Sequence, residues 1–117
     1  MEEQSTIDVS NQVFERAADL FGLLGTPIRL RIIRELCGSE LNVSELLARI
    51  KVTQPNMSQH LGLLYRAGLV SKRREGAQMF YQVSGDASLL VCASVGSLLS
   101  ECVHESTQMV LMQNTID

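Results

Sequence analysis

The chain has 117 residues, a formal net charge of −3 and 45% apolar residues, which is enough for one small domain with a hydrophobic core. Because there is no Trp, that core is expected to be aliphatic. No uninterrupted apolar run is long enough to span a membrane, and the acidic, polar start lacks the pattern of a signal peptide. We therefore expect a cytoplasmic protein with a single domain over residues 1–117.

The acidic net charge conceals one strongly basic segment. Residues 46–74 contain six Lys and Arg residues and no Asp or Glu, whereas residues 1–45 sum to −4 and residues 75–117 to −5. Phosphate contacts require cations that no neighbouring carboxylate neutralises. The middle segment is therefore the expected surface for a polyanion.

Two helices are expected in the first third of the chain. Apolar residues recur at helical spacing over residues 10–24, and Gly25 ends that helix. Thr26 is a candidate N-cap for the second helix, Pro27 suits its first position, and Gly38 suits its end.

The middle segment predicts two short helices joined by a three-residue turn. Asn42 and Glu45 form a capping-box pattern that opens the first of them, over residues 44–50. Thr53 or Gln54 caps the second helix, whose apolar residues recur at i, i+4 and i+7. Its buried stripe is expected to consist of Met57, Leu61 and Leu64.

Two further elements follow. Alternation of polar and apolar residues predicts a β-hairpin over residues 69–83. Residues 86–105 predict a long apolar helix for which the chain offers too little partner surface, so a face for self-association is expected. Residues 106–117 either extend that helix or form a flexible tail.

These elements predict a mainly helical fold with a small hairpin, the winged helix-turn-helix. In this motif the start of the second helix faces base edges in the major groove, and nearby cations hold phosphates. Gln and Asn can pair with adenine, and Ser with several base edges. The candidate DNA-binding residues are Gln54, Asn56, Ser58, Gln59 and Arg66 on the helix, and Lys72, Arg73 and Arg74 on the wing.

Three stretches, LGTPIRLRIIRELC, NVSELLARIKVTQPNMSQHLGLLYRAGLV and REGAQMFYQV, resemble the ArsR/SmtB family of winged-helix repressors. The resemblance covers roughly residues 20–102 and implies that residues 43–83 read DNA. It also implies a homodimer formed through the helices at 10–24 and 86–105, and release from operator DNA when an inducer acts. By position in the motif, Thr53 and His60 join the recognition residues, although a helical His is equally suited to packing.

An enzyme is not expected. The sequence has no glycine-rich phosphate loop, no nucleophile elbow and no cluster of acids and bases at useful spacing. We therefore expect no resident cofactor. The alternative to a DNA-binding protein is a winged-helix module that binds only protein, for which the acid-free segment would have no role.

Many members of the family respond to metal ions, but their metal motifs are incomplete here. The arsenical type carries cysteines where this chain has Asn42 and Ser44. Of the four zinc-ligand positions in the last helix, only Asp86 and Cys102 are retained. The remaining weak metal candidates are Cys92, Cys102 and His104.

The cysteines are compatible with two kinds of inducer. One branch of the family senses reactive sulfur or oxidants through one Cys on the second helix and one on the last, which implies a link between Cys37 and Cys102 here. Cys37 lies about one turn later than in that branch, and Cys102 about two residues later. Cys92 fits better as a small packing residue. The alternative is a repressor that senses arsenite, antimonite or zinc through its cysteines.

Overall fold

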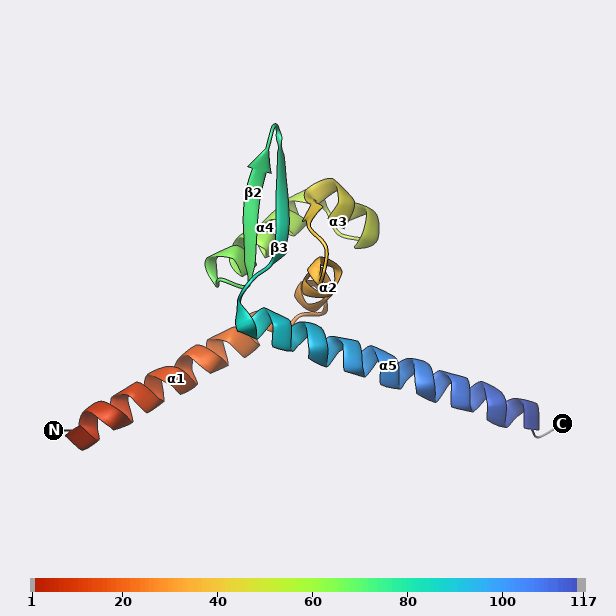
Figure 1. Ribbon diagram of the computed structural model, residues 1–117, viewed down its shortest axis with the longest axis horizontal. Helices are drawn as coiled ribbons and strands as arrows, with labels where there is room; N and C mark the ends of the chain where they lie inside the picture. The colour runs from red at the N-terminus through yellow and green to blue at the C-terminus, as the bar shows by residue number, and fades with distance from the viewer. Residues whose placement is uncertain (1, 116–117) are drawn as a thin grey trace.

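The computed structural model describes residues 2–115 of the backbone and the side chains of residues 9–103, 105, 108, 109 and 111. The predicted order of helices and hairpin is confirmed, and the fold is mainly helical (Figure 1). In chain order the elements are α1 (Glu2–Leu24), α2 (Pro27–Leu36), β1 (Leu41–Asn42), α3 (Val43–Arg49), α4 (Gln54–Arg66), β2 (Val70–Glu75), β3 (Gln78–Val83) and α5 (Gly85–Thr115).

Local capping sets the starts of α3 and α4. The Asn42 side chain accepts a hydrogen bond from the Glu45 amide at 2.8 Å, and the Glu45 carboxylate accepts one from the Asn42 amide at 3.1 Å. Thr53, rather than Gln54, caps α4 by accepting from the Asn56 amide at 3.3 Å. These side chains satisfy amides that have no partner within the first helical turn.

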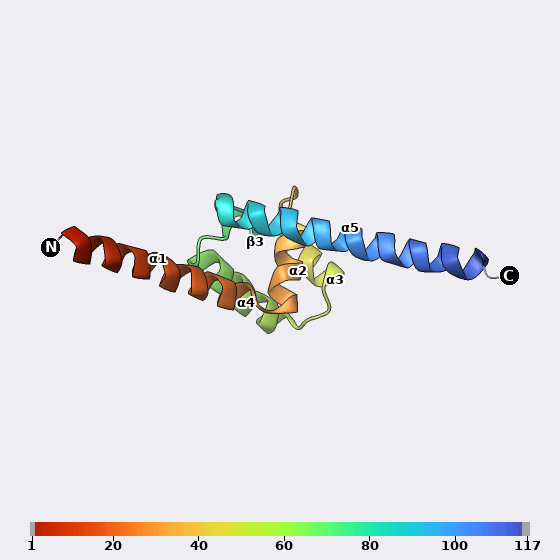
Figure 2. The same cartoon turned by 90° about the horizontal axis from the view of Figure 1, so that it is seen from below.

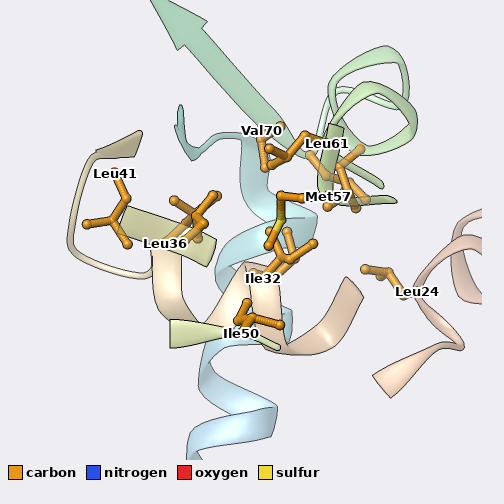
Figure 3. Packing of buried hydrophobic residues seen from close by; sticks show 12 residues of the cluster. Leu24, Ile32, Leu36, Leu41, Ile50, Met57, Leu61 and Val70 are labelled. Carbon is orange, nitrogen blue, oxygen red and sulfur yellow. The ribbon is translucent and has the colours of Figure 1, made fainter. Parts of the chain in front are cut away.

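The hydrophobic core lies where α2, α3 and α4 meet the base of the wing (Figure 3). The predicted stripe of α4 is completely buried and packs with apolar residues of α2. The residues of these two helices that have no exposed surface are Ile32, Ile33, Leu36, Met57, Leu61 and Leu64. Close packing of this kind fixes the rotation of α4 about its axis, so its opposite face is left to solvent.

The wing is an antiparallel hairpin of β2 and β3, and β1 adds a short third strand alongside β3. Successive side chains of a strand point to opposite faces, so Lys72 and Arg74 share one face and Arg73 lies on the other. Strand β1, in which Leu41 pairs with Tyr81, was not predicted because two residues carry no recognisable periodicity.

Helices α1 and α5 extend from the base of this body as two long arms that point in roughly opposite directions (Figures 1 and 2). Helix α1 is longer than the sequence predicts, since it begins at Glu2, and α5 continues to Thr115, which agrees with one of the two expectations for the segment from residue 106. The added stretches contain no Gly or Pro that would interrupt a helix. Within the described residues, the segment from residue 106 therefore extends the helix and is not a separate tail.

The arms carry large apolar side chains that the chain itself does not cover. Phe14 and Phe21 of α1 are 71% and 74% exposed, and Leu90 of α5 is 69% exposed. The other exposed large apolar residues on the arms are Val9, Val13, Leu89, Leu98, Leu99, Val103, Met109 and Leu111. Two apolar faces of this extent predict that something outside this chain covers them.

One stretch of α5, Gly85–Val103, is long and apolar enough by length and composition to cross a membrane. The sequence prediction concerned uninterrupted apolar runs, so this average over the whole stretch does not contradict it. Small polar residues such as Ser88 and Ser94 interrupt the run without making the stretch polar on average.

Candidate nucleic-acid interface and cysteine pair

One face of α4 is polar and open to solvent at its N-terminal end. Met57 and Leu61 are buried, which turns the side chains between them outward. The exposed candidate recognition residues are Thr53, Gln54, Asn56, Ser58 and Gln59. Their amides and hydroxyls can both donate and accept hydrogen bonds, as base edges in a groove require.

His60 differs from these five residues because it is half-buried and bonded within the protein. Its Nδ1 accepts a hydrogen bond from Nε of Arg29 at 3.1 Å, and Nη1 of Arg29 donates to the Leu23 carbonyl at 2.9 Å. Arg29 thus connects the end of α1 to the recognition helix. Burial and the adjacent Arg29 charge both lower the pKa of His60, so the neutral imidazole is favoured.

Acids from outside the basic segment neutralise two of its six cations. Arg49 forms an ion pair with Glu35 at 3.2 Å. Arg73 pairs with Glu40 at 2.5 Å and with Glu75 at 2.8 Å, and these hydrogen bonds raise the pKa of Arg73. The predicted wing contact Arg73 is therefore neutralised by two carboxylates, which the count of charges along the chain does not reveal.

Among the described residues, three of the four cations of the basic segment that form no ion pair lie in the turn before α4 and on β2, namely Lys51, Lys72 and Arg74. The ammonium of Lys72 is 4.2 Å from the centre of the Tyr65 ring, which holds this side chain against α4. Arg74, on the same face of β2, is exposed and has no ion pair within the described part of the chain. Lys51, in the turn before α4, is likewise exposed. Sequence reasoning counted Lys51 in the basic segment but did not select it as a contact.

Arg66 lies apart from the other candidates. It occupies the last turn of α4, about 18 Å along the helix axis from Gln54. It lines a hollow at the base of α1 together with Arg16 and Asp19. This position separates Arg66 from the N-terminal end of α4, where the recognition residues gather.

Cys37 and Cys92 form a disulfide between the C-cap of α2 and α5. Their Cα atoms are 6.2 Å apart, within the usual range for a direct bond. The predicted link between Cys37 and Cys102 is wrong, because Cys102 is exposed and lies about 15 Å further along α5. Helix α5 passes α2 near its own start and then extends beyond the body (Figure 1), so Cys92 lies opposite α2.

Cys92 is therefore more than a small packing residue. The sequence could not distinguish the two roles, because a Cys among Val91, Ala93 and Val95 is typical of both a core position and half of a disulfide. Its partner sulfur, that of Cys37, lies 3.0 Å from the Ile33 carbonyl, to which the reduced thiol can donate.

No group of three or more metal-ligating residues gathers among the described residues. Of the three weak candidates, Cys92 is bonded to Cys37, and Cys102 stands alone on the exposed surface of α5. The side chain of His104 lies outside the described residues. A site that uses all three cysteines is excluded by the separation of Cys102 from the pair.

Comparison with known proteins gives a family match in the middle of the chain. Residues 26–72, from the N-cap of α2 into the first strand of the wing, match the family model described as "Bacterial regulatory protein, arsR family". The matched segment contains α3, α4 and the turn between them, which is the part that presents the polar face.

Three relatives illustrate the similarity. A biofilm growth-associated repressor of Agrobacterium fabrum is 41% identical over 75 residues. This chain therefore spans less than two thirds of that protein, since the aligned residues cover 62% of this chain and 64% of the repressor. The structure of the transcriptional repressor BigR from Xylella fastidiosa has 32% identity and a TM-score of 0.67, covering 85% of this chain and 95% of BigR. Reduced HlyU from Vibrio cholerae has 34% identity and a TM-score of 0.66, covering 76% and 90%.

Acidification is expected to destabilise the folded protein through His60. Because the pKa of His60 is lowered from its usual 6.5, the unfolded chain binds this proton more tightly than the folded state. The contribution to stability is complete above pH 6.5 and is lost as the pH falls below it. Urea unfolding midpoints at pH 7.5 and 5.5 measure the effect.

The variant His60→Asn keeps an acceptor near the position of Nδ1 but does not titrate, so its midpoint should fall less on acidification than that of the wild type. His104→Asn, which replaces the only other histidine, is the matched control. An equal loss in the wild type and His60→Asn would contradict a role for His60 in the pH dependence.

Proposed function

Since this chain belongs to the ArsR/SmtB family of transcriptional regulators, we propose that it is a homodimeric repressor whose operator binding is switched by the Cys37–Cys92 pair. Proteins of this family are DNA-binding regulators and not enzymes, as the sequence predicted. The observation that carries the proposal is the disulfide between α2, which packs on the recognition helix, and α5, which forms an arm. The place of action would be the cytoplasm, where operator DNA lies.

The DNA-reading surface would be the polar face of α4 together with the wing. Gln54, Asn56 and Gln59 would reach base edges, while Lys51 and Arg74 would hold phosphates on either side. This arrangement resembles the usual docking of helix-turn-helix proteins, in which two recognition helices of a dimer enter successive major grooves about 34 Å apart.

A second copy of the chain is the occupant that best fits the exposed faces of α1 and α5. The two arms extend from the body in roughly opposite directions (Figure 2), and each carries large exposed apolar side chains such as Phe14 and Leu98. The relatives named above are repressors and regulators, and the family typically dimerises. Insertion of Gly85–Val103 into a membrane is the competing explanation for the same surface.

The switch would act through the core. The Cys37–Cys92 bond fixes the end of α2 against α5, and Ile32 of the same helix lies beside Met57 of α4 in the core (Figure 3). Because a close-packed core moves as a unit, a shift of α2 relative to α5 would displace α4 relative to the arms. In a dimer this would change the spacing of the two recognition helices. Trivalent arsenic or antimony bound by the same two thiols would have a similar effect.

The DNA-binding proposal predicts different effects for adjacent wing residues. The DNA for this test is a duplex selected from a random pool by the wild-type protein. Arg74→Ala should lower the affinity for this duplex. It should also reduce the slope of log K against log salt by about 0.9 for each phosphate that the protein no longer neutralises. Arg73→Ala is the matched control and should change the slope less, because Arg73 is already paired. Fluorescence anisotropy at several salt concentrations measures both.

Gln59→Ala tests readout of bases by α4. It should weaken binding of the selected duplex by about 1–3 kcal/mol without changing the salt slope. Unchanged affinity in both Arg74→Ala and Gln59→Ala would contradict the proposed interface.

The dimer proposal predicts that a charge on the exposed apolar face of α5 separates the subunits. Leu98→Glu should convert the protein from dimer to monomer in light scattering, because the carboxylate would lie in a desolvated interface. Glu101→Gln on the same helix should leave the mass unchanged. A wild-type protein that is monomeric and binds lipid vesicles would instead support the membrane explanation.

The switch proposal predicts that oxidation changes operator affinity only when both members of the pair are present. Closing the bond in the wild type or in Cys102→Ser should reduce affinity about 5- to 150-fold, the usual range of allosteric coupling. Cys92→Ser should bind DNA equally well before and after oxidation.

A decrease in affinity that requires Cys102, or no decrease on formation of the Cys37–Cys92 bond, would contradict this switch. In the second case, titration with arsenite and antimonite tests the alternative inducers.

A further inference from the structure

The two cysteines of the pair differ in their position relative to a hollow beside α2. A cavity of about 770 Å³ lies between α2, the end of α3 and α5, and Cys37 lines it whereas Cys92 does not. The volume is in the range typical of sites for small molecules. Cys37 is therefore the member of the pair that a compound in this hollow would meet first.

The cavity wall carries an excess of positive charge. Its charged residues are Arg31, Arg34 and Arg49 together with a single acid, Glu35. Arg49 is paired with Glu35, and Arg31 donates a hydrogen bond to the backbone carbonyl of Arg49 at 3.1 Å. Arg34 is exposed and has no ion pair within the described part of the chain. The wall as a whole has a net charge of about +2.

Arg34 is also the cation nearest to Cys37 along α2. It precedes Cys37 by three residues, which places the two on one side of α2 with Cβ atoms about 5–6 Å apart. Cys37 lies at the C-terminal cap of α2, where the partial negative charge of the helix repels anions. The arginines offset this repulsion, so that an anion can approach Cys37.

We propose that this arginine-lined cavity binds a small anionic sulfur compound, one that carries a carboxylate and a sulfur–sulfur bond, and presents it to Cys37. The inference rests on the proposed redox switch and names the class of compound that closes it. The carboxylate is bound by Arg34 and its neighbours, and the apolar part of the compound lies against Leu30.

Closure of the bond then takes two exchange steps. The Cys37 thiolate attacks one sulfur of the compound R–S–S–R, the sulfur–sulfur bond breaks, RS⁻ leaves, and a mixed disulfide forms on Cys37. The Cys92 thiolate attacks the Cys37 sulfur, the mixed disulfide breaks, and a second RS⁻ leaves. The two protein thiols lose two electrons and two protons, and the compound gains them as two RSH.

The test compares an anionic and a neutral compound of similar size on the full-length protein. Reduced Cys102→Ser protein is treated with 3,3′-dithiodipropionate or with 2-hydroxyethyl disulfide, and formation of the Cys37–Cys92 bond is followed by mass spectrometry of quenched samples. Arg34→Gln is made in the same background. Arg74→Gln, on the distant wing, is the matched control.

The readout is the rate of disulfide formation with the anionic compound divided by the rate with the neutral compound. This ratio cancels differences in general thiol reactivity between variants. Arg34→Gln should lower this ratio at least about threefold, and added salt should lower it in the parent protein, because electrostatic attraction speeds only the anionic compound. Arg74→Gln should leave the ratio unchanged. A ratio equal in the parent and Arg34→Gln would overturn the proposed site.

Operator binding of the oxidised products keeps this inference separate from the proposed function. If both compounds close the bond and release DNA but Arg34→Gln does not change the ratio, the redox switch stands and the anion site is wrong. If the ratio changes as expected but closure leaves DNA binding intact, the anion site stands and the switch is wrong.

Discussion

The structure depends above all on the burial of α2. This ten-residue helix contributes Ile32, Ile33 and Leu36 to the core, where they meet the apolar stripe of α4, and it ends at Cys37, which is bonded to α5. The recognition helix α4 thus shares one core with α2, and one of the two arms is bonded to the end of α2. Because these contacts are fully buried, α4 cannot move independently of α2. The proposed site for sulfur chemistry and the proposed surface for DNA are therefore connected through the core.

Charge is distributed so that each arginine has a distinct environment. Arg73 is enclosed by two carboxylates, Arg29 bonds His60 and the end of α1, and Arg34 is left open beside Cys37. The open cations, Arg34 and Arg74, lie at the two places where an anion would be expected, beside the cysteine pair and on the wing. A chain with a negative net charge can therefore attract two different anions, because local fields and not the total charge govern close approach.

Structural features that depend on residues close together in the sequence could be predicted from the sequence. Contacts that depend on how distant helices and strands pack could not. The capping box of Asn42 and the N-cap of α4 depend on residues within one helical turn. The sequence predicted the first and restricted the second to Thr53 or Gln54. The pairing of Cys37 with Cys92 depends on where α5 crosses α2, and the pairing of Arg73 with Glu40 depends on how β1 lies beside the hairpin. Such distances are not encoded in any local pattern, so the wrong cysteine was chosen and a neutralised arginine was counted as free.

The Cys37–Cys92 bond joins residues 55 positions apart, and the chain between them contains α3, α4 and the whole wing. Closing a loop of this length restricts the unfolded chain and, in the chain-entropy model, stabilises the fold by about 4 kcal/mol. The oxidised form would therefore be the more resistant to unfolding and to proteolysis, although it is the form proposed to leave DNA. A cell that returns to reducing conditions would then recover its repressor by reducing an intact pool of protein, without new synthesis.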